Sequence, residues 1–305
     1  MLTATDLRTV VGTAVTAPSV HNAQPWSFTA TPTGLELLAD TRRGLPRQDP
    51  DGRELLISCG AASLHAQLAL RGLGLGCGLG LLPDDTRPDL VAVLTPSGSV
   101  PPTPAERRLL QAVPRRHTDR GPYADWPVPL EAVDALGAAA DAEGAWLQVL
   151  SSVDVLELAL WQAHAAAAVG ADPDALAERA SWARQDGDAA DGVPGATVPG
   201  WPAGRRARDR HVPDDVVLVL GTDHDDRLSW VRAGRALDRL LLDATARGLV
   251  AAPATLALEL PALRHGLTRA LALRGAPQVV LRVGYPAGLG SPRSGRRPIG
   301  EVLVH

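Results

Sequence analysis

A short polar turn near the N-terminus brings several hydrogen-bonding side chains together. Residues 18–26 read PSVHNAQPW, so Ser, His, Asn and Gln lie between two prolines. Because proline fixes φ and lacks an N–H, the two prolines exclude regular helix here. Short polar side chains in a rigid turn can hold a flat polar ligand, or they can cap local backbone groups. The residues alone leave both interpretations open.

Two groups of arginines could bind an anion. Residues 115–120 read RRHTDR and place three arginines around a hydroxyl, and Arg293, Arg296 and Arg297 lie close to the C-terminus. Guanidinium groups match the oxygens of phosphates and carboxylates in charge and geometry. A solvated basic turn is the commoner outcome for the first group, and a frayed basic tail is the alternative for the second.

These segments resemble, in sequence order, elements of the FMN-dependent nitroreductase superfamily. The turn is similar to the signature P-S-x-x-N-x-Q-P-W, and His21 before Asn22 is most similar to the Acg-like branch. Residues 116–120 resemble the family element Arg-x-Ser/Thr-x-Arg/Lys. Residues 253–255 occupy the place where the family runs its backbone past the flavin, and 296–298 resemble its terminal basic element. The resemblance therefore covers nearly the whole chain.

The resemblance implies an FMN site in which the residues have defined roles. Polar groups of the turn would hold the ring and ribityl atoms, and Arg120 would lie beside N1 and O2 of the flavin. A backbone N–H within 253–255 would face flavin N5, the alternative being a plain helix-to-helix turn. The phosphate would be bound by Arg116, Arg296 and Arg297. The full set of implied cofactor-binding residues is Pro18, Ser19, Asn22, Gln24, Arg116, His117, Thr118, Arg120, Pro253, Ala254, Thr255, Arg296 and Arg297.

The implied function is that of a nitroreductase-type oxidoreductase. Hydride would pass from NAD(P)H or another reductant through FMN to an unknown small organic acceptor. The alternative is a non-catalytic protein that sequesters flavin under a closed lid. Thr16 stands where Acg-like proteins usually carry Arg, so one charged anchor for the cofactor is missing. His21 is either a proton donor near the flavin or a hydrogen-bonded structural histidine.

Composition excludes several other classes of function. The 305 residues carry a net charge of -4, which argues against binding nucleic acid. All 30 basic residues are Arg, so a P-loop lysine and a Lys Schiff base are both excluded. The sequence contains neither G-x-S-x-G nor H-E-x-x-H, and its histidines show no ligand-like pairing, so we expect no metal site. The expected partners are a small-molecule substrate and NAD(P)H.

The same composition bears on the cellular compartment. Cys59 and Cys77 are too few for a disulfide framework and are not spaced as C-x-x-C, which fits a reducing cytoplasm. The first residues lack the apolar core of a signal peptide. The apolar stretch 156–169 is interrupted by polar residues and is too short to cross a bilayer. We expect a cytoplasmic protein, either a monomer or a homodimer.

The resemblance and the pattern of elements together predict an α+β fold of nitroreductase type. Two fused halves, residues 1–104 and 105–305, would form an intrachain pseudo-dimer with antiparallel or mixed sheets surrounded by helices. Long helices at 53–70 and 228–247 both lead into Arg-Gly-Leu, which is weak evidence for internal duplication. Because each half supplies different motifs, we expect one FMN per chain. The irregular segment at about 185–215 is expected to be a lid over the cofactor.

Periodicity predicts the remaining elements. An opening helix at 6–15 would be capped by Thr5, and Cys59 would be a core residue on the apolar face of its helix. The glycine-rich run 72–80 does not fit G-x-G-x-x-G and is expected to be a close-packed connection. The proline-rich segment 96–104 is the expected linker between the halves. The other expected helices are 153–169, 173–184 and 260–271, and the expected strands are 27–30, 35–39, 90–94, 216–220 and 278–284.

Overall fold

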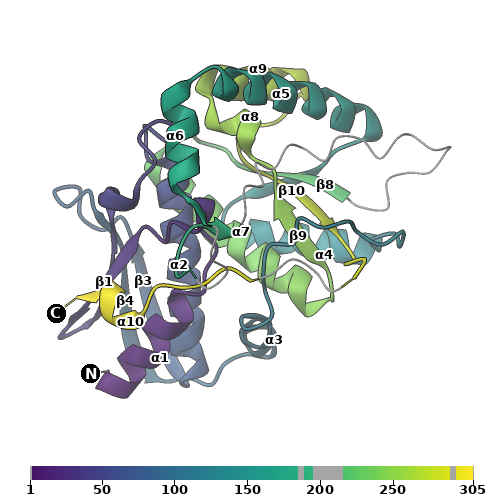
Figure 1. The fold of residues 1–305 in the computed structure, drawn as a ribbon. Helices are drawn as coiled ribbons and strands as arrows, with labels where there is room; N and C mark the ends of the chain where they lie inside the picture. The colour runs from purple at the N-terminus through teal and green to yellow at the C-terminus, as the bar shows by residue number, and fades with distance from the viewer. Residues whose placement is uncertain (1, 185–188, 195–215, 289–292, 305) are drawn as a thin grey trace.

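The computed structural model describes residues 2–184, 189–194, 216–288 and 293–304. In these residues helices surround two main sheets, which confirms the α+β class (Figure 1). The first elements along the chain are α1 (Ala4–Ala14), η1 (Val20–Asn22), β1 (Trp26–Thr31), β2 (Gly34–Ala39), η2 (Thr41–Arg43), α2 (Arg53–Gly72), β3 (Leu75–Leu81) and β4 (Leu90–Ser99).

The later elements of the described chain are helices, the four strands of a second sheet, a separate pair of short strands, and a last strand that joins the first sheet. The chain continues with α3 (Pro104–Ala112), α4 (Leu130–Asp141), β5 (Trp146–Val149), α5 (Ser152–Gly170), α6 (Pro173–Ser181), β6 (Ala183–Arg184) and β7 (Val193–Pro194). It ends with β8 (Val216–Thr222), α7 (Arg227–Ala246), β9 (Val250–Pro253), α8 (Leu256–Glu259), α9 (Pro261–Ala270), β10 (Ala276–Gly284), α10 (Ile299–Val302) and β11 (Leu303–Val304).

The first sheet is completed by the end of the chain. Its strand order is β11-β1-β2-β4-β3, with β11 parallel to β1 and the other neighbours antiparallel. Leu303 of β11 pairs with Phe28 of β1, so the two termini lie near each other (Figure 1). The pairing anchors the segment that carries Arg296 and Arg297, and the alternative of a frayed tail is wrong for the described residues.

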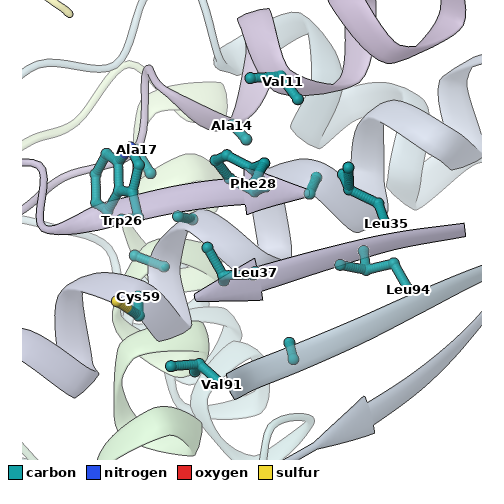
Figure 2. Close-up of a cluster of buried hydrophobic side chains, with 14 of the residues drawn as sticks. Val11, Ala14, Ala17, Trp26, Phe28, Leu35, Leu37, Cys59, Val91 and Leu94 are labelled. Atoms are coloured by element: carbon teal, nitrogen blue, oxygen red, sulfur yellow. The ribbon is translucent and has the colours of Figure 1, made fainter. Parts of the chain in front are cut away.

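The core beneath this sheet is built from both flanking helices. Figure 2 shows Val11 and Ala14 of α1 packed over Phe28, Leu37 and Leu94 of the strands, and all five are fully buried. The helix α2 closes the same cluster from another side. Apolar side chains at helical spacing in α1 and at alternate positions in the strands produce this single core.

Cys59 of α2 belongs to this core, as the sequence predicted. Its side chain is fully buried and its thiol donates to the carbonyl oxygen of Pro25 at 3.2 Å. Burial raises the pKa of the Cys59 thiol far above its usual value. The residue is therefore a packing group and not a nucleophile.

The second sheet is covered on both faces. Its order is β5-β8-β10-β9 and every neighbouring pair is antiparallel. In β8, Leu218 and Leu220 pack with α4 and α7, whereas Val217 and Val219 pack with α5, α8 and α9. Because successive side chains of a strand point to opposite faces, burial of both faces explains the continuous apolar run.

The cap of the first helix differs from the expectation. The helix α1 begins at Ala4 and is capped by Thr3, whose hydroxyl accepts from the N–H of Asp6 at 3.1 Å. The carboxylate of Asp6 accepts in return from the N–H of Thr3 at 2.9 Å. Thr5 was the wrong cap, because only Thr3 stands three residues before an acidic side chain that can complete this reciprocal pair.

The glycine-rich run is largely strand, so the prediction of a close-packed connection there is wrong, and the expected linker begins as strand, because its residues 96–99 belong to β4. The strand β3 pairs with β4 along its length and turns alternate residues, including Leu79, toward the core. Because glycines alternate with the apolar residues in this run, its period of two residues was not recognised as that of a strand. The strand β4 continues through Pro96, which lies opposite Cys77. The neighbouring strand β2 pairs with β4 no further than Leu94. On that side no strand requires a backbone N–H from residue 96, so a proline is tolerated there.

The two long helices α2 and α7 pack against each other through glycines. A Cβ added to Gly60 would lie 2.1 Å from the carbonyl oxygen of Val231, and one added to Gly234 would lie 1.9 Å from that of Ile57. Gly60 and Gly234 each stand seven residues after the first residue of their helix, and Ile57 and Val231 each stand four after it. The contact is therefore reciprocal, which is the relation expected across a two-fold axis.

The described part of the chain lacks membrane-spanning helices and clusters of metal-ligating side chains. None of its helices combines the length and apolar composition that crossing a membrane requires. Among the described residues, no group of three or more His, Cys, Asp or Glu side chains is arranged to hold a metal ion.

Candidate functional site

The polar turn has an unusual backbone. His21, Asn22 and Gln24 have φ angles of 45°, 53° and 50°, in the left-handed region that residues other than glycine rarely adopt. Such residues cost on the order of 1–3 kcal/mol each. Ser19 fixes the conformation, because its hydroxyl accepts from the N–H of Gln24 at 3.0 Å and its carbonyl from the N–H of Asn22 at 3.0 Å. Strain held in this way concentrates at functional sites.

The amide side chains of the turn are engaged by other segments. Asn22 Nδ2 donates to the carbonyl oxygen of Gly192 at 3.1 Å, and Gln24 Nε2 donates to that of Ala190 at 2.8 Å. Gln24 Oε1 accepts from the backbone N–H of Arg297 at 2.9 Å. The turn is thus bound both to residues 189–194 and to the C-terminal segment.

Only part of the expected lid can be placed. Residues 185–188 and 195–215 lie outside the described residues. In the described part, Val193–Pro194 form β7, and Asp191 makes ion pairs with Arg43 and Arg184. This part lies directly on the polar turn.

The ring of His21 lies beside charged groups of other elements. Its Nε2 lies 3.0 Å from Gln48 Oε1, so this nitrogen carries the proton and donates. Burial lowers the pKa of His21, and the charges of Arg179 and Arg120 act in the same direction, whereas Gln48 and Glu259 oppose it. A neutral, hydrogen-bonded ring follows.

The basic element runs alongside the second sheet. Thr118 forms a bridge with Ala251 of β9, and the N–H of Asp119 donates to the carbonyl oxygen of Ala251 at 3.1 Å. The strand β9 ends at Pro253. The structure therefore brings together the basic element and the 253–255 segment, which are far apart in the sequence.

The 253–255 segment joins a strand to a helix, so the helix-to-helix alternative is wrong. The N–H of Ala254 donates to the carbonyl oxygen of Val280 at 2.8 Å, and its own carbonyl accepts from the amide of Gln162. The hydroxyl of Thr255 lies 3.5 Å from Glu259 Oε1. Since proline has no N–H and that of Ala254 serves the sheet, Thr255 is the candidate backbone donor.

Two guanidinium groups, that of the buried Arg116 and that of the half-buried Arg296, meet at one carbonyl oxygen. Arg116 Nη2 and Arg296 Nη2 donate to the oxygen of Thr16, at 3.1 and 3.2 Å. Arg296 Nη1 also donates to Asn22 Oδ1 at 3.1 Å and to the carbonyl oxygens of Ser294 and Gly295 at 3.0 and 2.9 Å. The Nε atoms of both arginines are buried and have no hydrogen-bond partner among the residues that the structure describes. We call Arg116 and Arg296 the arginine pair.

The arginine pair is electrostatically unfavourable by itself. Burial, and then the charge of Arg116, lower the pKa of Arg296 to about 10. Burial also lowers the pKa of Arg116, which Asp238 partly opposes. Two like charges in a poorly solvated place, with polar atoms left over, are stabilised when an anion binds between them. This donor set fits a phosphate.

Arg297 differs from its neighbour Arg296 at Nε, which in Arg297 lies 3.5 Å from a carboxylate oxygen of Glu301. Its Nη1 donates to the carbonyl oxygens of Gln24 and Trp26, at 3.2 and 3.3 Å, and its Nη2 to that of Glu301 at 3.1 Å. The guanidinium of Arg297 therefore has protein acceptors on both sides. It fastens the end of the chain to the turn.

The remaining predicted residues lie around this group. Pro18 and His117 are half-buried, and His117 Nδ1 lies 3.1 Å from the carbonyl oxygen of Arg115. Arg120 is exposed. The structure thus gathers all the predicted segments, and the contact of each of these residues with a cofactor stays a prediction.

A buried ion pair beside Thr16 was not predicted from the sequence. His65 of α2 and Asp238 of α7 are both 0% exposed, and Nε2 of the first lies 3.0 Å from Oδ2 of the second. Each residue stands within the apolar face of its helix. A polar residue at a core position on each of two long helices was the available signal.

Comparison with curated proteins identifies full-length relatives. A Mycobacterium tuberculosis protein named "Putative NAD(P)H nitroreductase Rv3131" is 36% identical over 321 residues, which cover 98% of this chain and 91% of that protein. The protein named "Putative NAD(P)H nitroreductase acg", from the same organism, is 29% identical over 99% of this chain and 96% of its own. No protein-family model matches the chain.

Solved structures give more distant matches. A nitroreductase with bound FMN from Bacteroides fragilis aligns with 65% of this chain and 98% of its own. The identity is 13% and the TM-score is 0.43.

Proposed function

This chain belongs to the Acg-like branch of the nitroreductase superfamily, and from that premise we propose that it uses FMN to pass hydride from NAD(P)H to a small organic acceptor. The names of the mycobacterial relatives support NAD(P)H as the donor. When bound, FMN supplies the two-electron chemistry, and the protein supplies binding, orientation and charge.

The arginine pair is the observation that carries this proposal. Arg116 and Arg296 come from distant parts of the sequence, share the carbonyl oxygen of Thr16, and each keep a buried Nε without a partner among the described residues. A dianionic phosphate would accept from these groups and compensate both charges. An uncharged ligand would leave the positive charges of Arg116 and Arg296 uncompensated.

The roles of the other residues are those that the family resemblance implies. We propose that Ser19, Asn22 and Gln24 hold the ring and the ribityl chain. The N–H of Thr255 would face flavin N5, and Arg120 would lie beside N1 and O2. A cation there stabilises the negative charge that the pyrimidine ring gains on reduction.

A second function is favoured by the contacts of the polar turn. The amides of Asn22 and Gln24 donate to the carbonyl oxygens of Gly192 and Ala190, so the 189–194 segment uses donors that we assign to the flavin. A protein in which this segment stays in place could hold flavin without exchanging electrons with substrates. Steady-state oxidation of NADPH with a quinone or a nitroaromatic separates the two, because a sequestering protein gives no turnover.

We expect the purified protein to bind one equivalent of FMN non-covalently. The proposed phosphate site consists of the arginine pair and the carbonyl oxygen of Thr16 that both arginines share. The sequence contains no second PSVHNAQPW turn to complete another site. Heat denaturation should release the flavin, and titration of the apoprotein should reach its end point at one FMN per chain. A protein that stays colourless and does not bind added FMN contradicts the proposed function, and an end point of two contradicts the single site.

We expect R120A to lower the two-electron midpoint potential of the bound flavin by roughly 20–60 mV, the equivalent of about 1–3 kcal/mol for a hydrogen bond to a charged group. The cation interacts mainly with the reduced anion, so FMN affinity should change less than the potential. The matched control is R115A, which removes an exposed arginine in the same segment. Equal potentials in R120A and R115A would place Arg120 away from the ring.

A further inference from the structure

The ion pair of His65 and Asp238 joins the two long helices behind the arginine pair. Both side chains are fully buried, with His65 Nε2 at 3.0 Å from Asp238 Oδ2. On the other side of the ring, Nδ1 lies 3.1 Å from the hydroxyl oxygen of Thr16 and 3.2 Å from the carbonyl oxygen of Thr13. The ring therefore lies between a carboxylate and the residue whose carbonyl holds the arginine pair.

The hydrogen bonds decide how many protons the ring carries. The hydroxyl of Thr16 donates to the carbonyl oxygen of Thr13 at 2.7 Å, so its hydrogen is not available to His65. Nδ1 faces two acceptors and must carry a proton. Nε2 faces the Asp238 carboxylate, and a bare nitrogen there would leave an uncompensated buried anion, which is very costly. A proton on Nε2 gives an imidazolium beside a carboxylate, a pair with no net charge.

The charge of Asp238 matters to Arg116. Asp238 is close enough to favour the charged form of Arg116. Arg116 Nε has no hydrogen-bond partner among the described residues, and neither has either carboxylate oxygen of Asp238, whose contact with His65 is an ion pair and not a hydrogen bond. If Asp238 carried its full charge without compensation, it would compete with an incoming anion for Arg116.

We propose that His65 is a positioning residue that neutralises Asp238 and orients Thr16, and so keeps the arginine pair available to a phosphate. The inference rests on the proposed function, because the phosphate is taken to be that of FMN. The ring acts through two contacts: its Nε2 compensates the carboxylate, and its Nδ1 fixes the hydroxyl of the residue whose carbonyl receives both guanidinium groups.

The test compares FMN with riboflavin, which has the same ring and ribityl chain but no phosphate. Dissociation constants for the apoprotein are measured by quenching of flavin fluorescence. We expect H65Q to weaken FMN binding on the order of tenfold, the scale of one hydrogen bond to a charged group, and to change riboflavin binding little. Equal weakening of both flavins, or none, overturns the proposal.

The matched variant is D238N, which keeps the shape of the side chain and removes its charge. His65 then loses its anionic partner and becomes neutral, so the charge facing Arg116 does not change. We expect the ratio of FMN to riboflavin affinity to stay near that of the wild type in D238N and to be recovered for the most part in the H65Q/D238N double variant, which still lacks the contact of His65 with Thr16. If the double variant has the same ratio of FMN to riboflavin affinity as H65Q alone, His65 does not act through its charge.

Two further measurements test the role of His65 without comparing the affinities of the two flavins. Nitrogen NMR of the wild type should show both ring nitrogens of His65 protonated at pH 7.5, and a neutral ring overturns the proposal even if H65Q does not fold. Inorganic phosphate should raise the melting temperature of the apoprotein more in the wild type than in H65Q. If the wild type bound no FMN, the proposed function would fail, and the phosphate result alone would decide the role of His65.

Discussion

R296A should lose FMN affinity by roughly 10–100-fold, corresponding to about 1.5–3 kcal/mol for hydrogen bonds to a charged group. Arg296 brings a half-buried guanidinium to the carbonyl oxygen of Thr16, where Arg116 already lies, and its buried Nε has no partner within the described part of the chain. A phosphate would gain both the charge and the unused donor. Riboflavin binding should change much less, because riboflavin presents no anion to this group. Equilibrium titration of the apoprotein with each flavin measures the difference.

The neighbouring arginine provides the control. Arg297 donates to the carbonyl oxygens of Gln24 and Trp26, so R297A should lower stability and affect both flavins alike. R296K keeps the charge but loses the planar fork, and we expect it to bind FMN with intermediate affinity. If R296A weakened FMN and riboflavin equally, Arg296 would be a structural residue and the phosphate would lie elsewhere.

The sequence could identify the parts of this site because each has a local signature. The polar turn, the basic element and the terminal arginines were found from residue types and order, and the two long helices from their period of 3.6 residues. The α+β class followed from the same patterns together with the resemblance. The structure brings these segments together as predicted, although the binding role of each residue still awaits the experiments above.

The partners of those residues could not be predicted, because they are not local. Nothing near Gln24 indicates that its amide meets Ala190, and a carbonyl oxygen such as that of Thr16 has no signature in the residue type. The strand β11 is two residues long and depends on a partner from the other end of the chain. Pairing of this kind depends on tertiary context and not on propensity.

Internal duplication is supported by more than the shared Arg-Gly-Leu ends. Gly60 and Gly234 occupy equivalent positions in helices of equal length, and each approaches a carbonyl oxygen of the other helix at an equivalent residue. A two-fold interface between identical subunits has this reciprocal character. We propose that the helices α2 and α7 form the former subunit interface of a fused pair.

The same contact gives the largest effect on stability that we expect. G234A places a methyl group where a Cβ would lie 1.9 Å from the carbonyl oxygen of Ile57, so the two helices must move apart. We expect a loss of roughly 1–3 kcal/mol, the usual cost of overpacking, or more because the obstructing atom belongs to the backbone. Urea unfolding of the apoprotein measures the change.

The control for G234A is the same substitution at Gly137 in α4, where a Cβ would meet nothing within 4 Å. G137A should stabilise the protein by up to about 1 kcal/mol through helix propensity alone. G60A should resemble G234A, because its Cβ would lie 2.1 Å from the carbonyl oxygen of Val231. Once one methyl group has separated the helices, the second should cost less, so the double variant should lose less stability than the sum of the two losses. If G234A were as stable as G137A, the helices would not be in close contact at this point, and the case for a former two-fold interface would lose its structural basis.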